Sequence, residues 1–297
     1  VAKDYYLSEE PTAEELESIT YPVVVKAIDQ SANRGMSYCF SSEEISGAIK
    51  KAKSVSNSDT VVIERMLKGH EYTAWYPLAD GKASLINFAK MYHKDGYPSN
   101  CYSITTTYTD NLDLYLKEVD KNIKKVFSDI GCKEGIAWIE MMLDEDGHFY
   151  VIEMGYRMSG DMMALVHKNV CNFNSYGWLL DIAVGIKHTA NDLPKFEEKL
   201  PESIGCSYIL WSKKGGTITK WDGFETLNNK YNINVETTLG VGSKVEKHQY
   251  LAVITFNTSN YLEMCEAIRF INNNVEIWNE NENIIVYYDD LESLKIE

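Results

Sequence analysis

The chain of 297 residues is long enough for one large or two ordinary domains, and its 44% hydrophobic and 25% charged content is typical of a globular protein. The formal net charge of −15 argues against nucleic acid or an anionic membrane as the main partner, because either needs a basic face. No apolar run approaches the ~20 residues that cross a membrane, and an anionic ligand must be held by a local cluster of cations.

The six cysteines match no zinc or redox spacing, which predicts reduced thiols in a cytoplasmic protein. The sequence begins at Val1 without a signal or transit pattern. We therefore expect this start to be internal to a longer protein.

The first buried strand is expected at Tyr21–Ile28, a run rich in β-branched residues. A lysine inside such a strand, Lys26, needs an anion or must reach the surface, so it is either an edge-strand gatekeeper or a ligand of an anion. The loop that follows, residues 29–35, is small and polar and ends in Gly35. It can offer backbone N–H groups to a phosphate, with Arg34 adding positive charge.

Further elements follow in chain order. Ser41–Glu44 is a capping pattern before a helix, and strands are expected at Asp59–Met66 and from Glu71. An Asp80-Gly81 turn would then set Glu71 opposite Lys90, so a cross-strand ion pair is one interpretation of Glu71.

The polar segment His93–Tyr108 predicts a loop near the site, and apolar residues at helical spacing from Asn111 to about Ile130 predict an amphipathic helix. The composition of Asp192–Pro201 is that of a linker. Short β-like runs and a helix at Asn260–Asn272 beyond it predict a further α+β unit.

Two apolar runs flank Asp146-Gly147, a pair that favours a two-residue type I′ hairpin loop. That register sets Glu145 opposite His148 and Glu140 opposite Glu153, with Cβ atoms about 5 Å apart. Two carboxylates so close in apolar strands need a proton or a cation between them, and Mg²⁺ is a hard cation that takes oxygen ligands. The alternatives are a register slipped by one residue, or carboxylates at a solvated sheet edge.

In order, three stretches resemble the ATP-grasp superfamily, nearest to the branch of biotin carboxylase, carbamoyl-phosphate synthase and purine-pathway ligases such as phosphoribosylglycinamide synthetase. They are YPVVVKAIDQSANRGM, VVIERMLKGHEYTA and GIAWIEMMLDEDGHFYVIEMGYRMSG. The resemblance implies an α+β ATP-grasp fold, with two α+β subdomains sandwiching ATP, followed by a small carboxylase-type C-terminal α+β domain. The implied boundaries are 1–195 for the ATP-grasp domain (about 21–92 clamping the nucleotide, 93–195 holding metal and substrate) and 200–297 for the C-terminal domain.

The resemblance also implies nucleotide-binding roles. Lys26 would pair with the α- and β-phosphates, and the loop after it would close over the phosphates. The segment Glu64–Leu67 would be the adenine hinge, and Glu71 would take the ribose hydroxyls. The implied ligands of ATP are Lys26, Ser31, Arg34, Gly35, Glu64, Met66, Leu67 and Glu71, with the base edge read by the backbone of Met66 and Leu67.

For the metal, the resemblance implies that Glu140 and Glu153 hold Mg²⁺, as one or two ions that Mn²⁺ could replace. Arg157 would be the catalytic residue that stabilises the acyl-phosphate and the tetrahedral species after it. The family usually carries Asn as a further metal ligand where this sequence has Gly155. Water could replace it while Glu153 bridges two ions, or a second ion could bind weakly.

The implied activity is that of an Mg·ATP-dependent carboxylate–amine, or carboxylate–thiol, ligase acting through an acyl-phosphate, with small-molecule carboxylate and amine substrates. The alternatives are a bicarbonate-activating carboxylase and an ATP-binding module without catalysis. The family also places a domain before this one, so residues 1–297 alone are expected to bind nucleotide poorly and to be inactive.

Overall fold

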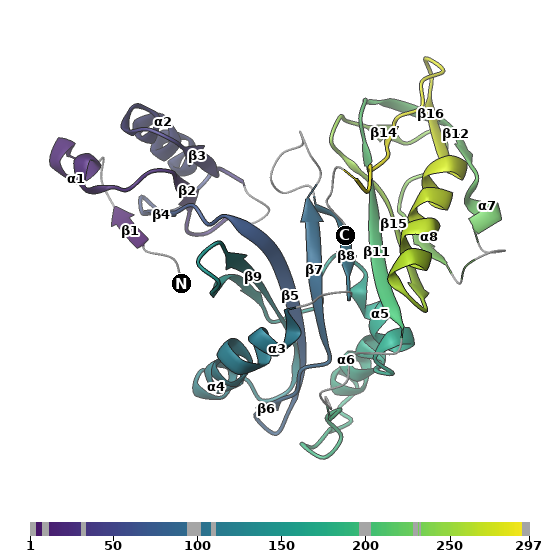
Figure 1. Cartoon of the computed structure of the whole chain (residues 1–297), viewed down its shortest axis with the longest axis horizontal. Coiled ribbons are helices and arrows are strands. Elements are labelled where there is room, and N and C mark those ends of the chain that lie inside the picture. The colour runs from purple at the N-terminus through teal and green to yellow at the C-terminus, as the bar shows by residue number, and fades with distance from the viewer. Residues whose placement is uncertain are drawn as a thin grey trace. The chain divides into compact units, whose positions relative to one another are not determined.

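The computed structural model describes residues 4–7, 12–30, 34–93, 102–107, 111–195, 203–227, 231 and 233–292 (Figure 1). Contacts divide the chain into two units. Unit 1 comprises Val1–Gly69 and Met142–Ile152, and unit 2 comprises His70–Met141 and Glu153–Glu297. The domain boundaries expected from the sequence stay a prediction.

Unit 1 contains an antiparallel four-stranded sheet in the order β1-β4-β2-β3. Alternate residues of β2, Val23, Val25 and Ala27, point into a core that Ile45 and Ile49 of α2 also enter. The strand and helix expected here are confirmed. The elements are β1 (Asp4–Leu7), α1 (Ala13–Ser18), β2 (Val23–Ala27), β3 (Ser37–Cys39), α2 (Ser42–Lys53) and β4 (Val61–Arg65).

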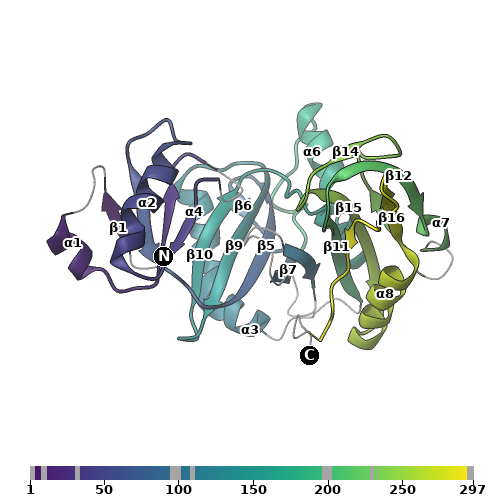
Figure 2. The ribbon, with the colours of Figure 1, turned by 90° about the horizontal axis from the view of Figure 1, so that it is seen from above.

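Unit 2 holds most of a ten-stranded sheet in the order β10-β9-β5-β7-β8-β11-β15-β13, in which β6 pairs with β5 and β17 with β11. Figure 2 shows β10, β9 and β5 side by side at one end of this order. The strands are β5 (Gly69–Ala79), β6 (Lys82–Ala83), β7 (Asn87–His93), β8 (Tyr102–Thr106), β9 (Gly135–Asp144), β10 (Phe149–Gly155), β11 (Ile204–Ser212), β13 (Asn234–Glu236), β15 (Tyr250–Thr258) and β17 (Val286–Tyr287).

Helices and a small sheet complete unit 2. The amphipathic helix expected at 111–130 is present, with a π-helical turn, η1, in its middle. The helices are α3 (Leu112–Tyr115), η1 (Leu116–Asp120), α4 (Lys121–Asp129), α5 (Met163–Val170), α6 (Ser175–Ala183), α7 (Phe224–Leu227) and α8 (Tyr261–Asn274). The small sheet has the order β14 (Lys244–Val245), β12 (Gly216–Asp222) and β16 (Glu276–Asn279). No helix in the described part of the chain is long and apolar enough to cross a membrane.

The prediction of a loop at His93–Tyr108 is wrong for the residues of this segment that the structure describes. Residues 102–106 form β8, which pairs with β7 and β11. Ser103, Thr105 and Thr106 of this strand are fully buried. Polarity suggested a loop, but threonine is β-branched and suits a strand between two neighbours.

At position 69, both the lack of room for a Cβ atom and the positive φ angle require glycine. Its φ is +154°, and a Cβ there would lie 1.9 Å from the carbonyl oxygen of Leu143, both in unit 1. We expect Gly69→Ala to lower the free energy of unfolding by about 2 kcal/mol or more in urea denaturation.

A matched control is Gly47→Ala. Gly47 lies inside α2 with no heavy atom within 4 Å of a built Cβ. Alanine there should raise the free energy of unfolding by roughly 0.5–1 kcal/mol, because it favours helix more than glycine does. Equal stability of Gly69→Ala and the parent chain would contradict the close approach of Gly69 to Leu143.

Candidate functional site

Lys26 lies on a central strand. β2 has β4 on one side and β3 on the other, so the interpretation of Lys26 as an edge-strand gatekeeper is wrong. Its Nζ donates to Oε1 of Glu64 on β4, and the two side chains are 30% and 19% exposed. The sheet of unit 1 thus presents a lysine and a glutamate together, on the face of β2 that does not enter the core.

The loop after Lys26 is described only in part. Ser31 lies outside the described residues, and Arg34 is exposed. Gly35 is buried with φ +82°, and a Cβ there would lie 2.5 Å from Cγ2 of Val55. Packing and backbone therefore account for this glycine, whatever the loop binds.

The segment Glu64–Leu67 is held by its backbone. The Met66 N–H donates to the carbonyl oxygen of Pro22 at 3.1 Å. That N–H is therefore occupied, and Met66 can meet a ligand through its carbonyl oxygen.

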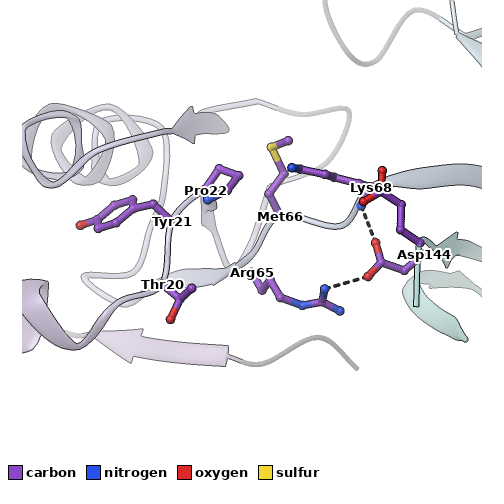
Figure 3. A pocket seen from close by; sticks show the side chains of 8 residues that line it. Thr20, Tyr21, Pro22, Arg65, Met66, Lys68 and Asp144 are labelled. Carbon is purple, nitrogen blue, oxygen red and sulfur yellow. Dashed lines mark hydrogen bonds and ion pairs between the residues drawn. The ribbon is translucent and has the colours of Figure 1, made fainter. Parts of the chain in front are cut away.

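Arg65 within this segment and Lys68 just after it both donate hydrogen bonds to the buried carboxylate of Asp144 (Figure 3). Arg65 Nη1 donates to Asp144 Oδ2 at 2.7 Å, and the Lys68 N–H donates to Asp144 Oδ1 at 2.5 Å. The hydrogen bond to Asp144 raises the pKa of Arg65. Asp144 therefore fixes residues 65–68 on the hairpin tip of unit 1.

Sequence reasoning missed Arg65 and Asp144. The available signal was an acidic residue at the end of an apolar strand, just before the Asp-Gly turn. The two residues line a pocket of about 210 Å³ in unit 1, together with Thr20, Tyr21, Pro22, Met66, Lys68 and Glu145.

The turn between β9 and β10 differs from the predicted type I′ loop. The Gly147 N–H donates to the Asp144 carbonyl, and the Asp144 N–H donates to the His148 carbonyl. Gly147 has φ +80°, whereas Asp146 is not among the residues with positive φ. The loop therefore has three residues, Glu145 to Gly147, and Asp144 rather than Glu145 faces His148.

Glu71 does not face Lys90. The register of β5 and β7 pairs Glu71 with Met91 and Tyr72 with Lys90, so the alternative interpretation of Glu71 as the cross-strand partner of Lys90 is wrong. The Glu71 carboxylate instead meets Nε2 of His93 at 2.5 Å, and the carboxylate is 14% exposed. The ribose-binding role of Glu71 stays a prediction.

Glu140 on β9 is the most perturbed carboxylate near the predicted metal ligands. Burial, together with the negative charges of Glu71, Glu153 and Asp161, raises its pKa to about 8, although the positive charge of Arg157 opposes the shift. These five side chains, all in unit 2, therefore act on one another electrostatically. A bound cation would relieve the same repulsion that now favours a proton.

Asp161, which is not among the metal-binding or catalytic residues expected from the sequence, is 3% exposed. Its Oδ1 accepts from the Ser159 hydroxyl at 2.6 Å and from the Met163 N–H at 3.2 Å. The Ser159 hydroxyl in turn accepts from the Trp75 indole. Its own donors thus hold this carboxylate in place.

Glu140 and Glu153 provide some, but not all, of the ligands that a hard cation needs. Glu140 and Glu153 offer carboxylate oxygens, which suit Mg²⁺. Across the described ranges no group of three or more His, Cys, Asp or Glu side chains is placed to hold a metal ion. An ion on these two carboxylates must therefore take its remaining ligands from water and from a bound molecule.

Comparison with known proteins bears on these residues. Residues 19–164 match the family model described as the ATP-grasp domain. A D-alanine–D-alanine ligase from Fervidobacterium nodosum is 24% identical over 148 residues, which are 46% of this chain and 44% of that ligase. The chain therefore covers less than half of that relative's length.

Solved structures share the fold. An L-amino acid ligase from Bacillus licheniformis has a TM-score of 0.73 and 22% identity, over 94% of this chain and 68% of that one. The biotin carboxylase domain of the Hydrogenobacter thermophilus 2-oxoglutarate carboxylase, solved with MgADP and bicarbonate, has a TM-score of 0.67 and 17% identity, over 88% and 59%. These likenesses confirm the predicted α+β fold class.

Asp144→Ala tests the attachment of residues 65–68. The change leaves the Arg65 guanidinium and the Lys68 N–H without their acceptor, so the free energy of unfolding should fall by about 3 kcal/mol in urea denaturation. Asp146→Ala is the control, because Asp146 is exposed, lies at the longer distance of 3.7 Å from Arg65, and accepts its hydrogen bonds from His148 N–H and the Tyr150 hydroxyl at the surface. Its effect should be much smaller. Equal effects of the two variants would contradict this role of Asp144.

The raised pKa of Glu140 predicts a pH dependence. Between its unfolded value near 4.5 and the folded value of about 8, only the folded chain keeps the proton, so stability falls as pH rises through this window. Glu140→Gln should remove this slope and raise the Tm at pH 8 by about 3 °C or more. Calorimetry from pH 5 to 9 measures it.

The same proton must leave when a cation binds. Mn²⁺ affinity, measured with a bound ATP analogue, should rise up to about tenfold per pH unit below pH 8 and then level off. Glu134→Gln, on an exposed residue just before β9, is the matched control and should keep both behaviours. A flat Mn²⁺ affinity from pH 6 to 8 in the parent chain would contradict the prediction.

Proposed function

We propose, from the premise that residues 19–164 are an ATP-grasp domain, that the protein is an Mg·ATP-dependent ligase. It joins the carboxylate of one small molecule to the amine, or thiol, of another through an acyl-phosphate. The observation that carries the proposal is the cluster of Glu71, Glu153 and Asp161 around Glu140, in which burial and the like charges raise the pKa of Glu140. Such a group gains most from a divalent cation.

Glu140 and Glu153 are the proposed metal ligands. When bound there, Mg²⁺ would neutralise the phosphate charge that builds up as the γ-phosphoryl group moves. The protein's share is positioning and charge neutralisation, and a covalent nucleophile is not required.

The proposed nucleotide contacts use groups that are already held in place. The Lys26 ammonium, which Glu64 now neutralises, would take the α- and β-phosphates. The carbonyl oxygen of Met66 and the backbone of Leu67 would read the base, and Glu71, held by His93, would accept the ribose hydroxyls.

The chemistry would balance as follows. A substrate carboxylate oxygen attacks the γ-phosphorus, and the bond to the β–γ bridging oxygen breaks, which releases ADP. The amine nitrogen then attacks the acyl carbon, the bond to the phosphate oxygen breaks, and the nitrogen loses a proton. Arg157 would stabilise the negative oxygens in both steps.

An amine partner is favoured by the names of two similar proteins, a D-alanine–D-alanine ligase and an L-amino acid ligase. We therefore propose amino acids among the substrates. Bicarbonate as the acid would make the protein a carboxylase instead.

Phosphate release from Mg·ATP by the full-length gene product tests the proposal. Carboxylic acids are paired with amino acids, ammonia and bicarbonate, and release should require one acid and one nucleophile. Release with bicarbonate would favour the carboxylase. Mg·ATP binding without release across the panel would favour a module without catalysis.

Glu153→Gln should lower phosphate release at least about 100-fold, because it removes one of two charged metal ligands. The control Glu134→Gln should retain full release. Unchanged release in Glu153→Gln would show that the metal assignment is wrong.

A further inference from the structure

A tryptophan occupies the space into which a side chain at position 155 would project. A Cβ built on Gly155 would lie 2.3 Å from Cε2 and 2.5 Å from Nε1 of Trp138. Gly155 is not among the glycines with positive φ. Glycine is therefore needed here for room, and not for backbone conformation.

This contact lies next to the predicted metal ligands. Trp138 and Glu140 are two residues apart on β9, and Gly155 and Glu153 are two apart on β10. Residues two apart on a strand share a face. Trp138 therefore lies on the same face of β9 as Glu140, and Gly155 lies on the same face of β10 as Glu153.

The indole of Trp138 also contacts the side chain of Arg157. The guanidinium carbon lies 5.0 Å from the Trp138 ring centroid, a cation–π geometry. The guanidinium makes a second contact, because Arg157 Nη1 donates to the Met158 carbonyl at 2.8 Å. Arg157 is exposed, whereas Trp138 is 4% exposed, so a buried ring supports an exposed cation.

The ring is not held by a hydrogen bond of its own. Trp138 Nε1 is buried and has no hydrogen-bond partner among the residues that the structure describes. A buried N–H without a partner is unfavourable for folding. The unpartnered N–H of Trp138 therefore lowers the stability of the folded chain. Compared with a smaller apolar residue, tryptophan offers Arg157 a wide aromatic face.

We propose that Trp138 is the positioning residue of Arg157, and that its ring fixes the guanidinium to hold the oxygens of the transferred phosphoryl group and the acyl-phosphate. This inference rests on the proposed ligase function. It assigns a role to the contact between Trp138 and Gly155, since any larger residue at 155 would displace the ring on which Arg157 lies.

Calorimetric titration of the full-length protein with two probes tests the proposal. Mg·ADP reports nucleotide binding alone, and Mg·ADP with aluminium fluoride adds a mimic of the transferred phosphoryl group. Trp138→Leu should weaken the second probe about tenfold and leave the first within about twofold. Trp138→Phe keeps an aromatic face and removes the unpartnered N–H, so it should bind both probes nearly as the parent does, without a lower Tm.

A glycine pair gives a test that keeps the tryptophan. Gly155→Ala should reproduce the loss seen in Trp138→Leu, because its Cβ must push the indole away from Arg157. Gly160→Ala is the matched control, since a Cβ at Gly160 meets no heavy atom within 4 Å. In an Arg157→Gln background, Trp138→Leu should cause no further loss.

The outcomes separate this inference from the proposed function. Unchanged affinity for the fluoride complex in both Trp138→Leu and Gly155→Ala overturns it, and so does an equal loss for both probes, which would mean a packing role. A parent protein that binds neither probe would remove the proposed function together with this inference.

Discussion

Burial of Glu140 beside Glu71, Glu153 and Asp161 raises its pKa to about 8, so near neutral pH the folded chain keeps a proton here that the unfolded chain releases. Two of these neighbouring carboxylates have a hydrogen-bond partner: His93 for Glu71, and the Ser159 hydroxyl for Asp161. The hydrogen-bonded neighbours cannot all rearrange to help Glu140. If the proposed cation binds here, it meets carboxylates that folding has already brought together.

Much of the frame could be predicted because local patterns specify it. The β-branched run of Val23, Val24 and Val25 suits a strand, whose alternation puts Val23, Val25 and Ala27 into the core and Lys26 on the other face. The pairing of the two acidic strands followed from apolar runs around an Asp-Gly turn. The roles of Lys26, Glu71 and Arg157 came from the order of three stretches, which no single stretch would support.

Register and long-range partners could not be predicted in the same way. A three-residue turn and a two-residue turn have the same Asp-Gly signature, and they differ by one residue in what faces what. The Asp80-Gly81 turn does have two residues, with Ala79 opposite Lys82, but the register shifts by one residue before Trp75 pairs with Asn87, and Glu71 therefore meets His93 instead of Lys90. The contact of Trp138 with Gly155 joins residues on two strands, and neither residue signals the other in the sequence.

That contact also restricts how the chain can evolve. A gain of any side chain at position 155 collides with the indole, and a smaller residue at position 138 leaves an unfilled space over Gly155. Substitutions at the two positions are therefore expected to depend on each other, with the loss of tryptophan tolerated best before a larger residue arrives at 155. Among descendants of this sequence, the two sites should change in that order and as a pair.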